Sequence, residues 1–252
     1  MQLLLPHQLL GFCHTPVCAV RAETTDCSEM VTQLTFGETV EVRSQLNHWI
    51  EIQSLSDGYR GFVDRRHLIG LTEKELRQWH DERNIQYTFI STIETPWGLL
   101  NTPAGSYLGN SSFNIGNYRF KHNSIEHEFN VTSFLNSLLN VPYLWGGKTS
   151  FGIDCSGFTQ LFYRLNSINL PRDASEQQAL GQDVSIDELA LHDLIFFQNQ
   201  QGKVTHVGIY LTNNQLIHAS GRVRIDRLQE GCIWNDELNE ITHQFHSIKR
   251  YL

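Results

Sequence analysis

The chain has 252 residues, 40% of them hydrophobic and 18% charged, and its formal net charge is −8 at pH 7. This length predicts more than one domain, each with enough apolar residues to bury a core. No cluster of Lys and Arg is present to neutralise phosphates, so we expect no nucleic-acid partner. No stretch approaches the ~20 apolar residues of a membrane span, so we expect no membrane segment either.

The amino-terminal residues and the cysteines both bear on the compartment. The apolar start MQLLLP has no Lys or Arg before it, is interrupted by Pro6 and His7, and lacks a small-residue cleavage pattern, so it does not resemble a signal peptide. The cysteines are odd in number and form no Cys-x-x-Cys pair, which favours reduced thiols in the cytoplasm over a zinc site. We therefore expect a cytoplasmic protein without a metal or cofactor. The cysteines are Cys13, Cys18, Cys27, Cys155 and Cys232.

Residues 14–69 contain short alternating strands separated by turn signals at Gly37-Glu38 and Asp57-Gly58, a pattern typical of a small β-barrel. The charged segment EKELRQWHDERN that follows suits a linker or a short helix. Residues 84–124 again contain strand-like pieces, QYTFISTI, GLLNTP, GSYLG and GNYRF. We interpret them as a second, diverged barrel, although the similarity between the two segments is too weak to call a repeat.

Cys155 precedes apolar residues at i, i+3, i+4 and i+7 spacing, which predicts one buried face of a helix that begins at this cysteine. Unpaired N–H groups and the positive end of the helix dipole stabilise an anion there, so we expect a lowered thiol pKa. A buried structural cysteine is the alternative for an isolated Cys. The surrounding glycines favour a reactive thiol, because they let a substrate backbone come close.

Three further runs, residues 193–197, 205–211 and 215–220, predict consecutive antiparallel strands, and the last two carry His206 and His218. An imidazole beside a thiol can take its proton, and a second group can orient that imidazole. The two histidines share a face of the sheet only if paired residue numbers sum to an even value. We therefore predict a three-residue loop, 212–214, that pairs Leu211 with Gln215, or else a bulge.

The motifs PYLWGG, GIDCSGF, LPRDASEQ, HDLIFF, THVGIY and LIHASG, in this order over residues 142–221, resemble an NlpC/P60 cysteine peptidase domain. The resemblance implies a papain-like core and hydrolysis of murein stem peptides between the D-Glu γ-carboxyl and a diamino acid. It implies that Cys155 is the nucleophile, His206 the base and His218 its orienting residue. Tyr143 matches a tyrosine that helps to hold the oxyanion, and an ordinary core aromatic is the alternative. Matching substrate contacts are Asp154 and Ser156; Trp145 fits either the site or ordinary core packing.

The first barrel resembles a bacterial SH3 (SH3b) domain through FGETVEV, the strand of Trp49 and DGYRGFV. One branch of the family, the γ-D-glutamyl-L-diamino acid endopeptidases, joins such domains to the peptidase and requires a free amino-terminal L-Ala. Glu23, Tyr59 and Asp173 match that branch, and Ser175 adds a hydrogen-bonding group. Binding an ammonium requires such partners, because a buried charge must be paired. Glu23 and Tyr59 fit equally well a solvated strand end and a turn aromatic.

The sequence thus predicts an α+β protein: an SH3b domain with an amino-terminal extension (1–70), a linker or short helix (71–83), a diverged SH3-like domain (84–124) and a papain-like NlpC/P60 domain (125–252). We expect a monomeric cysteine peptidase whose partner is a murein peptide with a free amino terminus, releasing L-Ala-γ-D-Glu in cell-wall recycling. The alternatives are a secreted endopeptidase that acts on intact wall, a binding module that has lost catalysis, and an acyltransferase on a related core.

Overall fold

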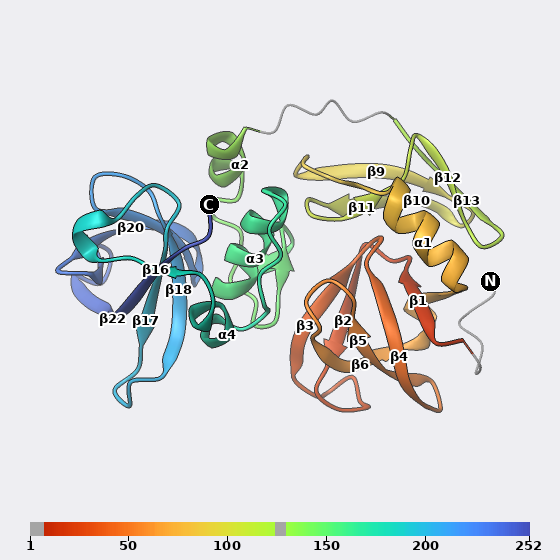
Figure 1. The fold of residues 1–252 in the computed structure, drawn as a ribbon, viewed down its shortest axis with the longest axis horizontal. Coiled ribbons are helices and arrows are strands. Elements are labelled where there is room, and N and C mark those ends of the chain that lie inside the picture. The colour runs from red at the N-terminus through yellow and green to blue at the C-terminus, as the bar shows by residue number, and fades with distance from the viewer. Residues whose placement is uncertain (1–7, 124–129) are drawn as a thin grey trace. The chain divides into compact units, whose positions relative to one another are not determined.

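The computed structural model describes residues 8–123 and 130–252. The chain divides into two compact units, Met1–Phe134 and Leu135–Leu252, and strands dominate both. Figure 1 shows the first unit in red to yellow-green and the second in green to blue. In the described ranges, no helix is long and apolar enough to cross a membrane.

The first unit begins with a seven-stranded antiparallel sheet in the order β3-β2-β6-β5-β4-β1-β7, which curves into a barrel (Figure 1). Two of its turns are built on glycines with left-handed backbone, Gly37 at φ 85° and Gly58 at φ 74°, as the turn signals predict. Its strands are β1 (Leu10–Cys13), β2 (Val17–Arg21), β3 (Met30–Thr35), β4 (Thr39–Leu46), β5 (Trp49–Ser54), β6 (Arg60–Asp64) and β7 (Leu68–Leu71), with a 3-10 turn at Arg65–His67 before β7.

The predicted charged helix is present as α1 (Glu73–Glu82), and a capping box between Thr72 and Glu75 starts it. Its Trp79 is buried and donates to the carbonyl of Gly37 at 2.9 Å. The strands that follow form a four-stranded sheet, β10-β9-β13-β12, and a two-stranded pair, β11-β8. They are β8 (Asn84–Ile85), β9 (Ile90–Thr95), β10 (Gly98–Pro103), β11 (Tyr107–Leu108), β12 (Ser112–Ile115) and β13 (Tyr118–His122).

One aromatic core joins these strands to the barrel. Phe12 and Phe36 of the barrel region pack with Trp79 of α1 and with Phe113 and Phe120 of the second sheet. The two β segments of the first unit are therefore held together by shared burial of aromatic surface. A second SH3-like barrel over residues 84–124 stays a prediction.

The second unit places its short helices before a long antiparallel sheet. Strand β22 pairs with β17 along its carboxyl-terminal half and with β21 along its amino-terminal half, so six strands close into a ring. The elements are α2 (Val131–Ser137), which spans the boundary between the units, β14 (Lys148–Thr149), β15 (Gly152–Ile153), α3 (Cys155–Leu165), α4 (Ala174–Ala179), β16 (Gln182–Asp183), a 3-10 turn at Ile186–Glu188, β17 (Leu194–Gln198), β18 (Val204–Tyr210), β19 (Gln215–Ser220), β20 (Arg222–Gln229), β21 (Cys232–Asn235) and β22 (Glu240–Arg250).

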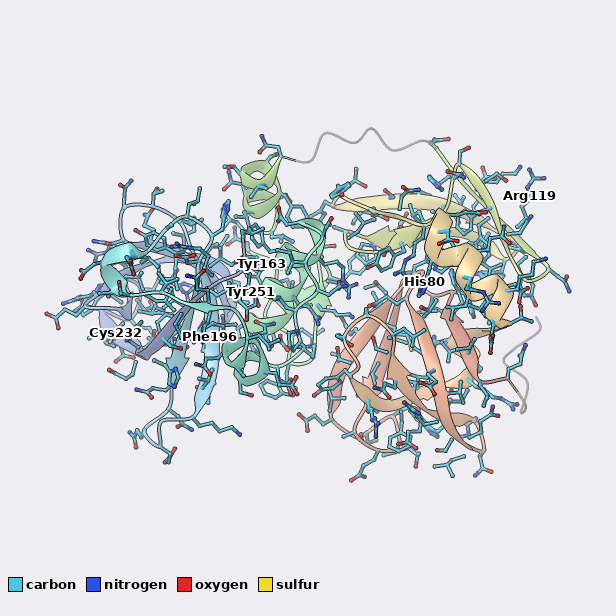
Figure 2. The ribbon with its side chains drawn as sticks, viewed as in Figure 1. His80, Arg119, Tyr163, Phe196, Cys232 and Tyr251 are labelled. Carbon is cyan, nitrogen blue, oxygen red and sulfur yellow. The ribbon has the colours of Figure 1, made fainter. Side chains whose placement is uncertain are left out.

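Helix α3 packs against β18 and β19 of this ring. Tyr163 on α3 donates to the carbonyl of His192 at 2.7 Å, and its ring meets that of Tyr251 edge to face at 5.4 Å (Figure 2). Tyr251 in turn donates to the carbonyl of Gln177 on α4. These contacts fix α3, and with it Cys155, relative to the sheet that carries both predicted histidines.

Candidate active site

Cys155 is the first residue of α3, as the apolar spacing predicts. Asp154 caps the helix: its Oδ1 accepts a hydrogen bond from the N–H of Gly157 at 2.7 Å. The predicted buried positions Phe158, Leu161 and Phe162 are at most 3% exposed. The sulfur therefore lies at the amino end of a buried and firmly capped helix.

The carboxylate of Asp154 has several protein partners besides Gly157. Arg172 binds both of its oxygens, with Nη2 2.5 Å from Oδ2 and Nη1 3.1 Å from Oδ1, and Gly146 donates its N–H to Oδ2 at 2.8 Å. Nη1 of Arg172 also donates to the hydroxyl of Ser156 at 2.9 Å. In this structure, Asp154 and Ser156 therefore contribute to positioning the start of α3.

Backbone contact between α3 and the preceding loop explains two of the glycines around Cys155. An ideal Cβ at Gly157 would lie 2.2 Å from the carbonyl oxygen of Gly147, and one at Gly147 would lie 2.5 Å from the carbonyl oxygen of Gly152. Neither gap admits a methyl group. The glycines are thus required by the packing of the loop against the helix.

The two predicted histidines face each other. Leu211 donates its N–H to the carbonyl of Gln215 at 2.9 Å, and Ile209 pairs with Ile217, so the three-residue loop and its register are confirmed. This register places His206 and His218 on one face, where Nε2 of His206 lies 2.7 Å from Nδ1 of His218. Asn213 and Asn214 adopt the left-handed backbone, at φ 56° and 57°, that closes the loop.

The polar chain continues beyond His218 to residues that the sequence did not indicate. Nε2 of His218 lies 3.0 Å from Oδ2 of Asp226 on β20. The other oxygen of Asp226 accepts from Nη2 of Arg224 at 2.9 Å. His218 is 0% and Asp226 3% exposed, so this chain of contacts is shielded from water.

Cys155 lies beside β18, the strand that carries His206. The backbone N–H of Val207, the residue after His206, hydrogen-bonds to the Cys155 sulfur. Since Nε2 of His206 faces His218, the Nδ1 atom of the ring is the one left to interact with a thiol. The sulfur of Cys155 thus lies beside the strand that carries His206.

Burial determines the protonation of the thiol, against the expectation from the helix terminus alone. Burial, together with a smaller contribution from the adjacent Asp154 carboxylate, raises the pKa of Cys155 to about 12. The N–H groups of Val207 and Ser156 and the charge of Arg172 lower the pKa, but by less. The predicted lowering of the pKa is therefore wrong for the free protein, because burial outweighs the effect of the helix terminus and the capping carboxylate of Asp154 adds to it.

Burial also keeps the imidazoles neutral. It lowers the pKa of His206 well below the ordinary value, and the neighbouring His218 and His243 lower it further. The ring of His243, from β22, lies against that of His206, with centroids 4.1 Å apart and planes tilted by 32°. Phe197 packs beside His206 at 5.9 Å. The ring of His206 is thus held in place by its neighbours and is neutral at pH 7.

The two predicted aromatic site residues lie on the segment before α3. Burial raises the pKa of Tyr143, and the Cys155 and Asp154 anions would raise it further, so its phenol is a neutral donor near the sulfur. Trp145 is 61% exposed, which excludes the alternative of an ordinary core aromatic in the described structure.

Asp173 and Ser175 lie at the start of α4, next to Arg172. Gln177 of the same helix is fully buried and donates to the carbonyl of Ser156 at 3.0 Å. The segment is thereby tied to the helix of Cys155. The sequence analysis did not single out Gln177, and it did not anticipate that Arg172 pairs with Asp154, because these partners come from distant parts of the chain.

Glu23 and Tyr59 belong to the first unit. Glu23 is exposed just after β2, and Tyr59 is half-buried just before β6. Because β2 and β6 are neighbours, with Arg21 paired to Phe62, the two residues lie at the same end of the barrel. Their combination with Asp173 in one pocket stays a prediction.

Comparison with known proteins agrees with this geometry. The NlpC/P60 family model matches residues 140–243, and the model of the bacterial dipeptidyl-peptidase Sh3 domain matches residues 20–68. The gamma-D-glutamyl-L-lysine dipeptidyl-peptidase of Bacillus subtilis (strain 168) is 28% identical over 224 residues, 77% of this chain and 74% of that protein. Dipeptidyl-peptidase 6 of Lysinibacillus sphaericus is 28% identical over 246 residues, 81% of this chain and 86% of that protein.

A shorter match is the probable endopeptidase NlpC of Escherichia coli (strain K12), 46% identical over 88 residues, which are 34% of this chain and 57% of that protein. Among solved structures, an NlpC/P60 family protein from Bacillus cereus ATCC 10987 has a TM-score of 0.76 at 19% identity, covering 96% of this chain and 99% of that one, which shows a common fold. The chain therefore carries an NlpC/P60 domain over residues 140–243, with a bacterial SH3 domain ahead of it.

Proposed function

We propose that this chain is a cysteine peptidase in which Cys155 is the nucleophile, His206 the base and His218 the residue that orients it. The observation that carries the proposal is the contact between Nε2 of His206 and Nδ1 of His218 at 2.7 Å, on the strand whose Val207 N–H reaches the Cys155 sulfur. A nucleophile, a base and an orienting group in this order are what acyl transfer requires.

The neutral thiol and the neutral imidazole determine the order of the proton transfers. As the sulfur of Cys155 attacks the scissile carbonyl, its proton passes to Nδ1 of His206, so the charges form only when substrate is bound. The carbonyl oxygen becomes negative and is stabilised by the N–H of Cys155 and the hydroxyl of Tyr143. His206 then protonates the leaving amine, and water, activated by the same ring, hydrolyses the thioester.

For the substrate we propose a murein stem peptide cut between D-Glu and the diamino acid, with release of L-Ala-γ-D-Glu. The support is the named activity of the Bacillus subtilis relative, which covers 77% of this chain. We propose further that a free amino terminus is selected by Glu23, Tyr59 and Asp173, with Ser175 as an additional acceptor. Carboxylates are the groups that compensate a desolvated ammonium.

The second candidate is an endopeptidase that acts on intact wall. Its support is that a relative 46% identical over 88 residues, the probable endopeptidase NlpC of Escherichia coli, is named an endopeptidase and not a dipeptidyl-peptidase. The two candidates share the catalytic residues and differ in whether a blocked amino terminus is accepted. Recycling of released peptides in the cytoplasm belongs to the first candidate and wall cleavage outside it to the second.

Mass spectrometry of products separates the candidates. L-Ala-γ-D-Glu-L-Lys, its diaminopimelate analogue, their N-acetylated forms and intact sacculi are each incubated with the full chain and with Cys155→Ala. We expect the wild type to release the dipeptide only from free-amine substrates and Cys155→Ala to release none. Activity retained in Cys155→Ala contradicts the nucleophile, whereas equal cleavage of acetylated peptide contradicts only the selection of a free amine.

Matched carboxylate variants test the selecting residues. Glu23→Gln and Asp173→Asn should raise KM for the free-amine peptide about 10-fold or more, because each removes one charge that faces the ammonium. Glu29→Gln and Glu176→Gln make the same change at exposed positions nearby and should leave KM unchanged. Asp173 makes no side-chain capping bond in α4, so Asp173→Asn leaves the helix start intact. Equal KM in all four variants contradicts the assignment.

A further inference from the structure

The chain of polar contacts that starts at His206 ends in a carboxylate to which no role has been assigned. His206 contacts His218 at 2.7 Å, His218 contacts Asp226 at 3.0 Å, and Arg224 contacts Asp226 at 2.9 Å. Arg224 is held from its other side by Glu237, with Nη1 2.8 Å from Oε2. Asp226 and Arg224 lie on β20, and Glu237 lies on the turn that follows β21.

Donor and acceptor roles along this chain are fixed from its far end. Arg224 can only donate, and a carboxylate can only accept, so Asp226 accepts from Arg224 at Oδ1 and from His218 at Oδ2. The proton of a neutral His218 is therefore on Nε2, which leaves its Nδ1 as an acceptor. His206 must then donate its Nε2–H to that atom, which leaves Nδ1 of His206 free of a proton and able to take one from the thiol.

We propose that Asp226 is a positioning residue that sets the tautomer of His218 and, through His218, the tautomer that makes His206 a base. The inference rests on the proposed function of His206 and adds a group two contacts away from that residue. It needs no contact between Asp226 and substrate, which its 3% exposure makes difficult.

Arg224 determines the orientation of an amide side chain at position 226, and this makes the proposal testable. In Asp226→Asn, the amide oxygen must face Arg224, since two donors cannot pair, and the NH₂ group then faces His218. His218 would have to accept at Nε2 and carry its proton on Nδ1. His206 would in turn accept at Nε2 and carry its proton on Nδ1, where it can no longer receive the proton of Cys155.

Replacing Arg224 as well should undo this block. In the double variant Arg224→Met with Asp226→Asn, the amide is free to turn its oxygen toward His218 and restore the original tautomers. Arg224→Met alone keeps the carboxylate and should keep the tautomers. If Asp226 has only a structural role, the double variant should be less active than either single variant, because it removes more of the ion-pair network.

The experiment combines two readouts on the full-length chain. Long-range ¹H–¹⁵N correlation spectra of histidine-labelled protein report which nitrogen of each ring carries the proton, without any substrate. Steady-state kinetics on L-Ala-γ-D-Glu-L-Lys report kcat and KM. The control is Asp236→Asn, which removes a carboxylate paired with Arg227 at a side chain 58% exposed.

We expect Asp226→Asn to move the proton of both rings from Nε2 to Nδ1 and to lower kcat by a factor on the order of 10³ to 10⁴, the scale of a wrong tautomer in other triads. KM should change little, and the double variant should recover at least 10-fold of the lost kcat. Asp236→Asn should resemble the wild type. Unchanged tautomers in Asp226→Asn, or a double variant no better than the single one, overturns the proposal. If the wild type cleaves no peptide, the proposed function fails, while the spectra still decide the role of Asp226.

Discussion

Arg172 and Asp154 form a buried ion pair, with Nη2 2.5 Å from Oδ2 and side chains only 2% and 6% exposed. Asp154 is at the same time the residue that caps the helix of Cys155. The pair therefore joins the segment before α4 to the start of α3, and it neutralises a carboxylate that would otherwise be desolvated without a partner.

Arg172→Met should destabilise the protein by about 3 to 5 kcal/mol, because it leaves the Asp154 carboxylate buried and unpaired. Arg222→Met is the matched control, since Arg222 pairs with Glu237 at a side chain 42% exposed, and its cost should stay below about 1 kcal/mol. Urea denaturation of the full chain, together with hydrogen exchange of the α3 amides, measures both. Equal stability of the two variants would show that the pair has no such role.

The Cys155 thiol should react slowly with iodoacetamide at neutral pH, because burial raises its pKa to about 12. The logarithm of the alkylation rate should rise by about one per pH unit up to pH 9, since only the thiolate reacts. Alkylation of Cys155→Ala gives the contribution of the exposed Cys27 and the half-buried Cys232 for subtraction. A plateau between pH 5 and 8 would instead indicate a preformed thiolate and imidazolium pair.

Stability should fall as the pH falls below about 6.5, the ordinary pKa of histidine. Burial lowers the pKa values of His206, His218 and His243, the last to about 4, so the unfolded chain binds protons in this range and the folded chain does not. The contribution of His243 is fully present above pH 6.5 and is lost between pH 6.5 and 4, by at most about 1.4 kcal/mol per pH unit.

The variant His243→Phe tests this account, because it keeps an aromatic ring against His206 and removes one titrating group. Urea denaturation at intervals between pH 7 and 4 should give a shallower loss of stability than in the wild type. Parallel curves for the two proteins would mean that His243 does not titrate as its burial implies.

Deleting Asn214 should abolish activity through geometry alone. The deletion shortens the 212–214 loop by one residue, and a two-residue connection shifts the pairing of β18 and β19 so that His206 and His218 point to opposite faces. We expect kcat to fall by at least about 10³, the scale on which triads lose rate when a member is removed. Asn214→Gly keeps the loop length and the positive φ of 57°, so it should retain activity. The kcat of peptide hydrolysis, measured for the Asn214 deletion and for Asn214→Gly, tests this prediction.

Local patterns were sufficient to predict the start of the Cys155 helix and the relation between His206 and His218. The first follows from the apolar spacing after position 155, and the second from strand parity and the length of one loop, all within short stretches of sequence. Both features are present in the structure. The helix at residues 73–82 was likewise indicated by its composition.

The remaining features depend on contacts between distant segments. Arg172 lies 18 residues from Asp154, and its pairing required knowing how the start of α4 packs on α3. Asp226, Arg224 and His243 lie on strands for which no register could be proposed, so nothing connected them with His218. The prediction of a lowered pKa for Cys155 was wrong for the same reason: the helix terminus is a local property, whereas burial is a property of the whole fold.

The double pairing of β22 has a consequence for incomplete chains. A polypeptide that stops before Glu240 lacks the strand that bonds to both β17 and β21, and it would leave the backbone groups of two strands open to solvent. Unsatisfied edges of this kind recruit other chains by strand addition, so such a fragment is expected to aggregate. Proteolysis ahead of β22 would therefore have this effect only when the cleaved strand dissociates from β17 and β21.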